Sequence, residues 1–288
     1  MKSSAIVKRL LPLVYFLIVS LPHHFFSDLF DKYLLIPFGM DSVQLWANVV
    51  SVGLILGVGA LGVRVMQVQR RAAVRHFLVW LATLSLIYAA DRLFIVNNIE
   101  RIHFPQYAVL AMLLSFSLPN HVLIFFVTCF AGLFDKFLQF VMNPSRTNYF
   151  DFNDIVLNIL GAALGVAFLL ALRRPATVER TTYEKRFRLV FLVSMAGMAL
   201  VLLIALALGR IVMLVEHVEQ RSVFDIVDDK LSFILSFERH DQFWQKSYFG
   251  KVFHVLSPAE GLAIIAGLFM ATWGAVRWLN VRWHERIP

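Results

Sequence analysis

The fold is decided by the stretch Gly132–Gly165, which reads GLFDKFLQFVMNPSRTNYFDFNDIVLNILGAALG. Two apolar runs in it flank a short polar segment that contains Arg146. Apolar runs joined by short polar connections predict helices that cross a membrane repeatedly, because a helix satisfies its own backbone hydrogen bonds in lipid. The polar residues of this stretch then lie at the ends of two consecutive spans.

The composition of the 288-residue chain supports the same class of protein. Hydrophobic residues make up 59% of it and charged residues only 16%, whereas about a quarter of the residues of a soluble domain are charged. The formal charge of +8 fits the excess of Lys and Arg in cytoplasmic loops, so no nucleic acid partner is expected. A single cysteine, Cys129, excludes an intrachain disulfide.

The apolar runs predict an all-α, polytopic membrane protein with about eight transmembrane helices. Pro119 and Asn120 are expected to break the long uncharged run that begins at Phe104, because the residue before a proline resists the helical conformation. The expected spans cover residues 10–26, 42–63, 77–96, 104 to the turn at 119, 121–142, 155–172, 189–208 and 261–279.

The charged residues predict the orientation of these spans. Alternating directions place sixteen Lys and Arg residues on one side together with only three acids, Glu179, Glu184 and Glu285. The positive-inside rule makes this side cytoplasmic, and an even number of spans leaves both termini there. The other sixteen of the 19 acids are expected on the outer side.

Three segments follow from this pattern. Residues 1–76 carry two N-terminal spans, 77–172 a four-helix core, and 173–288 two C-terminal spans that flank an external segment at about 211–258. Within the external segment, four apolar residues recur at helical spacing and predict an amphipathic helix. These residues are Phe224, Val227, Leu231 and Ile234.

Polar residues form a stripe near the end of the fifth span. Asp135 and Gln139 are four residues apart and therefore share a helix face. Ionisable residues inside a span are costly and are candidates for function. Lys136 is expected instead to extend to the membrane surface, and Asp91 and Arg92 in the third span to form a local ion pair.

The sixth span carries a matching stripe of Asp154, Asn158, Gly161 and Gly165 at i, i+4, i+7 and i+11. Its two glycines form a small-xxx-small contact that lets another helix approach closely. We therefore expect the polar stripes of the fifth and sixth spans to meet near the outer surface, beneath the loop with Arg146.

The start of the fourth span adds a third polar element. Glu100, His103 and Tyr107 recur at spacings of three and four, so they share a face if the helix includes all of them. Pro105 either interrupts this helix or marks its first turn. Three consecutive spans are thus expected to bring their polar ends to the outer side.

This ordered set of residues resembles the VanZ-like family over about residues 77–172. The residues that carry the resemblance are His103, Asp135, Gln139, Arg146, Asp154, Asn158, Gly161 and Gly165. Asp135 stands where glutamate is the commoner family residue. The family is multispanning and is named for a protein associated with teicoplanin resistance. The resemblance implies a role in the bacterial envelope, in the cytoplasmic (inner) membrane, without specifying a reaction.

Two main functional hypotheses follow, and the sequence leaves open whether the protein is an enzyme. The first is a membrane enzyme that acts on an envelope lipid or lipid-linked glycan at the outer face. Asp135 and Asp154 would divide acid and base roles, and His103 would carry a proton. Arg146 would hold a phosphate or carboxylate. The remaining candidate substrate-binding residues are Gln139, Asn158, Glu100, Asp151 and Tyr107.

The second hypothesis is a binding or scaffold protein without chemistry, which would use the same residues for a lipid head group or an envelope enzyme. Transport is a third, disfavoured by the lack of an inverted repeat. A purely structural alternative is that Asp151, Asp154 and Asn158 cap the sixth span while Arg146 pairs with a carboxylate. No tight His/Cys spacing indicates a metal, and no cofactor is expected.

Overall fold

Helices dominate the structure, a computed structural model that is 81% helical. It describes residues 2–20, 29, 31–68, 73–96, 98–118, 120–142, 150–172, 182–214, 224–236, 243–247 and 250–280. The α-helices are α1 (Lys2–Ser20), α3 (Ile36–Val68), α4 (Ala73–Leu93), α5 (His103–Leu114), α6 (His121–Met142), α7 (Phe152–Leu172), α8 (Thr182–Ala207) and α9 (Pro258–Asn280). Two short helices, η1 (Asp31–Leu35) and η2 (Asn98–Ile102), precede α3 and α5.

Among the described residues, four helices are long and apolar enough to cross a membrane. They are α6, α7, α8 over Lys185–Ala207 and α9 over Pro258–Leu279, and they overlap the last four predicted spans. A pair of helical segments at Lys32–Gly39 and Asp41–Gly57, bent by 117°, adds a fifth if it forms one broken span. The chain thus has the helices of a membrane protein.

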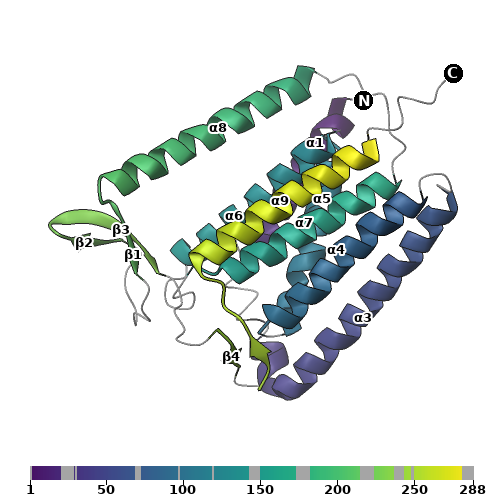
Figure 1. Cartoon of the computed structure of the whole chain (residues 1–288), viewed down its shortest axis with the longest axis horizontal. Coiled ribbons are helices and arrows are strands. Elements are labelled where there is room, and N and C mark those ends of the chain that lie inside the picture. The colour runs from purple at the N-terminus through teal and green to yellow at the C-terminus, as the bar shows by residue number, and fades with distance from the viewer. Residues whose placement is uncertain are drawn as a thin grey trace.

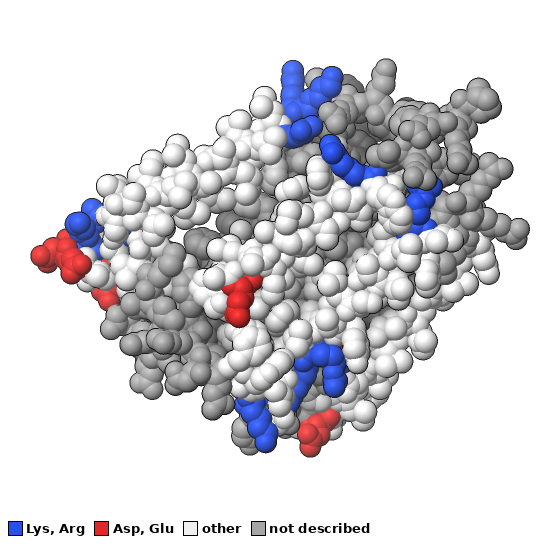
Figure 2. Space-filling model, in the orientation of Figure 1, with Lys and Arg blue, Asp and Glu red and all other residues white. Residues whose placement is uncertain are grey.

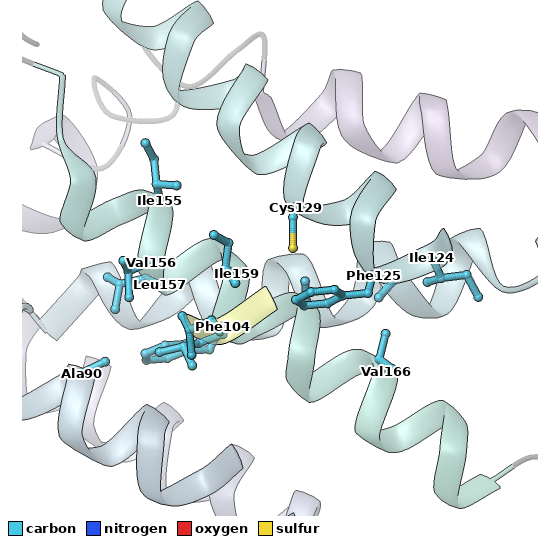
Figure 3. Close-up of a cluster of buried hydrophobic side chains, with 14 of the residues drawn as sticks. Ala90, Phe104, Ile124, Phe125, Cys129, Ile155, Val156, Leu157, Ile159 and Val166 are labelled. Atoms are coloured by element: carbon cyan, nitrogen blue, oxygen red, sulfur yellow. The ribbon is translucent and has the colours of Figure 1, made fainter. Parts of the chain in front are cut away.

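Helix α7 lies at the centre of the bundle and contacts α4, α5, α6 and α9 (Figure 1). From Ile159 onward it is apolar on all sides, and 89% of its spanning segment is buried, as expected for a helix that is apolar all round. Side chains from four helices meet in the core, including Ala90 of α4, Phe104 of α5, Phe125 of α6 and Ile159 of α7 (Figure 3). Cys129 is a free thiol buried in this core.

Two glycines allow α5 and α7 to approach one another closely. A Cβ atom on Gly161 would lie 2.8 Å from the carbonyl oxygens of His103 and Phe104, and one on Gly165 would lie 2.6 Å from the carbonyl oxygen of Ala108. Real Cβ atoms do not tolerate such distances, so only glycine fits this contact. The polar first half of α7 is thereby held against α5.

The break between α5 and α6 falls where Pro119 and Asn120 predict it. Helix α5 ends at Leu114, and α6 begins at His121. The Asn120 side-chain oxygen accepts a hydrogen bond from the Leu123 N–H at 3.1 Å and caps α6. Pro105 lies in the first turn of α5, where its missing N–H costs little.

The predicted amphipathic helix in the external segment is wrong. Residues of this segment form two strands, β2 (Phe224–Val227) and β3 (Lys230–Ser236), which pair antiparallel. The two-residue turn between them holds Asp228 and Asp229 at φ of 50° and 58°. Positive φ at both positions fits the right-handed twist of a hairpin and is tolerated by aspartate better than by most residues.

The hairpin is part of a three-stranded sheet in the order β1-β3-β2, in which β1 (Ile211–Leu214) pairs parallel with β3. Phe233 of β3 contacts Phe137 and Phe140 of α6, with ring centroids 5.9 and 6.2 Å apart. These contacts attach the sheet to the C-terminal end of α6. A second pair of strands, β4 (Gln245–Lys246) and β5 (Val252–Phe253), lies in the connection to α9.

Helix α8 stands apart from the bundle (Figure 1). None of its apolar spanning segment is buried, and the Phe191 ring meets Phe130 of α6 at 5.9 Å. An isolated apolar helix of this length needs a surrounding apolar medium, because its side chains would otherwise face water.

Candidate functional site

Seven polar side chains from three helices form one buried group, here called the polar cluster. Helix α5 contributes two from its first turns, α6 three near its C-terminal end and α7 two from its N-terminal half. They are His103 and Tyr107, Asp135, Lys136 and Gln139, and Asp154 and Asn158. The start of α5, the end of α6 and the start of α7 therefore bring these residues to the same end of the bundle.

Asp135 is the acceptor at the centre of the first half of the cluster. The Tyr107 hydroxyl donates to its Oδ2 at 2.7 Å, across the interface between α5 and α6. The Gln139 amide donates to the same oxygen at 3.2 Å, one turn along α6. Asp135 is only 1% exposed, so these donors replace the water that would otherwise solvate the carboxylate.

Asp154 is the acceptor in the second half. Lys136 Nζ lies 2.5 Å from its Oδ2, and His103 Nε2 lies 3.5 Å from its Oδ1. The prediction that Lys136 extends to the membrane surface is therefore wrong, since its side chain is buried and ion-paired. Pairing with Asp154 offsets the cost of burying the ammonium.

The spacing of residues in the sequence indicates that Lys136 lies on the same helix face as Asp135. Together with Gly132, Asp135 and Gln139 it follows the spacing i, i+3, i+4, i+7, which is one complete helix face. All four residues are buried in α6. A lysine within such a stripe faces the same neighbours as the aspartate beside it.

Asn158 connects α7 to the backbone of α6. Its amide donates to the Gly132 carbonyl at 3.3 Å. A Cβ on Gly132 would lie 2.8 Å from the Asn158 Cβ and 3.1 Å from the Tyr107 ring. A larger residue at position 132 would therefore separate the three helices where the cluster forms.

Three buried polar atoms of the cluster have no hydrogen-bond partner among the described residues. They are His103 Nδ1, Asp135 Oδ1 and Asn158 Oδ1. Each such atom costs about 1–3 kcal/mol when it is left unsatisfied in a protein interior. A native cluster with three of them has the chemistry of a binding site, since a bound polar group would satisfy them.

The other candidate residues have different positions. Asp151 Oδ1 accepts a hydrogen bond from the Asn153 N–H at 2.8 Å and caps α7, as the structural alternative predicts for this residue. Glu100 lies in η2, where its carboxylate accepts from the Val96 N–H at 2.9 Å. Arg146 lies outside the described residues.

The Asp154 carboxylate is engaged by Lys136 and His103. Asp91 pairs with Arg101 of η2 and not with Arg92. Two hydrogen bonds join this pair, at 2.5 Å from Nε and 3.1 Å from Nη2. Within the described residues, no group of three or more His, Cys, Asp or Glu side chains is arranged to hold a metal ion.

Asn153, beside Asp154, is a structural residue that the sequence did not single out. Its amide nitrogen donates to the carbonyl oxygens of Phe94 at 3.2 Å and His254 at 2.8 Å, and its oxygen accepts from the Leu256 N–H at 2.9 Å. The first turn of α7 is thus attached both to the end of α4 and to the segment that leads into α9.

Comparison with protein-family models, with curated proteins and with solved structures finds no match to this chain.

Proposed function

We propose that this chain is a VanZ-like integral membrane protein of the bacterial cell envelope that binds or processes a lipid or lipid-linked glycan at the outer face of the inner membrane. One observation carries the proposal. An otherwise apolar helical bundle brings the Asp154 carboxylate together with a buried carboxylate, ammonium and imidazole, and three polar atoms of the cluster, one of them on the Asn158 amide, have no partner among the described residues. Ionisable groups at membrane depth are expensive, and they are usually retained for function.

The distribution of charge supports an outward-facing site. Among the described side chains, Figure 2 shows only Lys and Arg at the end where α8 begins and α9 ends, and all the visible Asp and Glu toward the other end. The polar cluster lies at that other end, with the start of α7. By the positive-inside rule the basic end is cytoplasmic. In this proposal α1, α3, α4 and α5 complete eight spans, and both termini are cytoplasmic.

The geometry also supports acid–base chemistry by His103. Asp154 is an acceptor 3.5 Å from His103 Nε2, and Nδ1 on the other side of the ring has no partner among the described residues. A carboxylate that orients an imidazole in this way is a recurrent arrangement for a general base. His103 Nδ1 would accept a proton from a substrate hydroxyl or amine, and the guanidinium of Arg146 would hold a phosphate or carboxylate of the substrate.

A non-catalytic binding or scaffold role is the second candidate. The observation that favours it is the closure of the cluster, in which Asp135 and Asn158 are each 1% exposed. Catalysis would require substrate atoms to reach His103 and products to leave, whereas stable binding of one head group requires only a single opening.

A matched pair of histidine variants tests the proposal. His103→Gln removes the imidazole of the cluster, and His76→Gln removes another buried histidine, on α4. Both would be expressed in a strain that lacks the native protein, at equal membrane abundance. We would measure teicoplanin susceptibility, envelope lipid composition and labelling of the protein by photoreactive lipids.

Loss of the cellular phenotype in His103→Gln with lipid labelling retained would support an enzyme. Loss of both the phenotype and the lipid labelling in His103→Gln, with both retained in His76→Gln, would support a binding role. If His103→Gln and His76→Gln both match the native protein in phenotype and labelling, the cluster has no part in function and the proposal is wrong.

A further inference from the structure

The hydrogen-bonding state of the polar cluster identifies the kind of group that it can accept. Among the described residues, each donor atom already has an acceptor. Tyr107 and Gln139 donate to Asp135, Lys136 donates to Asp154, and Asn158 donates to a backbone carbonyl. The unsatisfied atoms are a carboxylate oxygen, an amide oxygen and an imidazole nitrogen.

The identity of these atoms as acceptors follows from their neighbours. The Gly132 carbonyl can only accept, so the Asn158 NH₂ group faces it at 3.3 Å and Oδ1 is the free atom. Both donors to Asp135 reach Oδ2 and leave Oδ1 unused. At His103, Nε2 faces the Asp154 carboxylate, and Nδ1 is the ring atom that has no partner among the described residues.

The charge of the cluster points in the same direction. The cluster contains two carboxyl groups, those of Asp135 and Asp154, against the single ammonium of Lys136. A phosphate would be repelled by these carboxylates and has no hydrogen to donate to the unpartnered oxygens, whereas a cation with several N–H donors would supply both a positive charge and hydrogens.

We propose that the polar cluster binds a protonated primary amine, the ammonium of a membrane-lipid head group, through Asp135 Oδ1 and Asn158 Oδ1. This proposal rests on the proposed function and defines its ligand class.

The route into the cluster is set by the side chains that are least covered. The Asp154 and His103 side chains are 14% and 10% exposed, whereas Asp135 and Asn158 are each 1% exposed. An ammonium would therefore pass Asp154 and His103 before it reaches Asp135. His103 Nδ1 lies on this route as an additional acceptor.

The full chain, purified in a neutral detergent, can test this with short-chain phospholipids that differ only in the head group. Binding is measured by native mass spectrometry and by the shift in melting temperature. The three head groups are ethanolamine, N,N,N-trimethylethanolamine and glycerol. The ethanolamine ammonium has three N–H donors, the trimethylated head group has the same positive charge and no donor, and glycerol has hydroxyls and no positive charge. We expect the ethanolamine lipid to bind about tenfold more tightly than either, as for hydrogen bonds to charged groups.

Asp135→Asn, which preserves shape and removes the charge, should abolish this preference. Asp225→Asn, the same change in the exposed strand β2, should retain it. Equal binding of the three lipids by the native chain would overturn the ammonium site while leaving head-group binding intact. The comparison needs only the native chain, so it holds even where Asp135→Asn fails to fold. Binding of none of the lipids would overturn both this inference and the binding role.

Discussion

Lys136 and Asp154 form a part-buried ion pair that joins α6 to α7, with Nζ and Oδ2 2.5 Å apart. The two residues are 18 positions apart in the chain, so the pair fixes how the end of one helix meets the start of the next. Asp154 also faces His103 of α5. One carboxylate therefore connects the three helices that form the polar cluster.

Lys136→Met should destabilise the protein strongly, because it leaves Asp154 buried without its cation. Breaking one side of a buried pair costs about 3–5 kcal/mol, which should appear as a lower melting temperature in detergent. The double variant Lys136→Met with Asp154→Asn should regain most of this loss, since no uncompensated charge is left. Lys230→Met, at an exposed lysine of β3, is the control and should change stability little. A single variant as stable as the native chain would mean that the pair is not buried.

Gly165→Ala should destabilise the contact between α5 and α7. The added Cβ would lie 2.6 Å from the Ala108 carbonyl oxygen and 2.8 Å from the Ala111 Cβ, and overpacking of this kind costs about 1–3 kcal/mol. Gly197→Ala on α8 is the matched control, because nothing lies within 4 Å of the new atom. There the better helix propensity of alanine should leave stability unchanged or slightly higher. Equal melting temperatures for the two variants would contradict the close approach of the helices.

Helix positions could be predicted from the sequence because long apolar runs and helix-breaking residues are local features. The break between α5 and α6 follows from the Pro119–Asn120 pair in the sequence. The stripes of Asp135 with Gln139 and of Asp154 with Asn158 follow from helical periodicity alone. The partner of Asp154 could not be predicted in this way. An isolated lysine near a span end is expected to reach the membrane surface, and this is the prediction for Lys136. Its spacing with Gly132 and Gln139, however, places it on the buried face of α6.

The hairpin of β2 and β3 was misread for a different reason. A helical spacing relates the four apolar residues Phe224, Val227, Leu231 and Ile234. The sheet instead depends on hydrogen bonds between neighbouring strands, which this spacing does not predict. The deciding local feature is the Asp228–Asp229 pair, which adopts positive φ at both positions. Two charged residues in the middle of an apolar run are a turn signal as well as a polar helix face.

Asp229→Gly should stabilise this hairpin. Asp229 has φ of 58°, which costs aspartate more than glycine, and Asp-Gly is a preferred pair for a two-residue turn with positive φ. The amide hydrogens of Phe224–Val227 and Lys230–Ser236 should exchange more slowly by a factor of a few, because the relief of left-handed strain exceeds the extra entropy that glycine loses on folding. Asp225→Gly, within β2, is the control and should accelerate exchange because glycine weakens a strand. Faster exchange in Asp229→Gly would contradict the turn geometry.

Asn153→Ala should release the segment that leads into α9 without disturbing the helices themselves. The Asn153 side chain holds Phe94 and His254 through its nitrogen and Leu256 through its oxygen, and alanine removes all three hydrogen bonds at once. The buried Leu256 N–H then has lost its acceptor, so opening of this segment becomes easier by about 1–3 kcal/mol. Hydrogen exchange at Leu256 should accelerate about tenfold or more, while exchange in the centre of α7 should be unchanged. Asn120→Ala also removes a side-chain acceptor at a helix start, that of the Leu123 N–H, and it should leave exchange at Leu256 as in the native chain. Unchanged exchange at Leu256 in Asn153→Ala would show that other contacts hold this segment against α7.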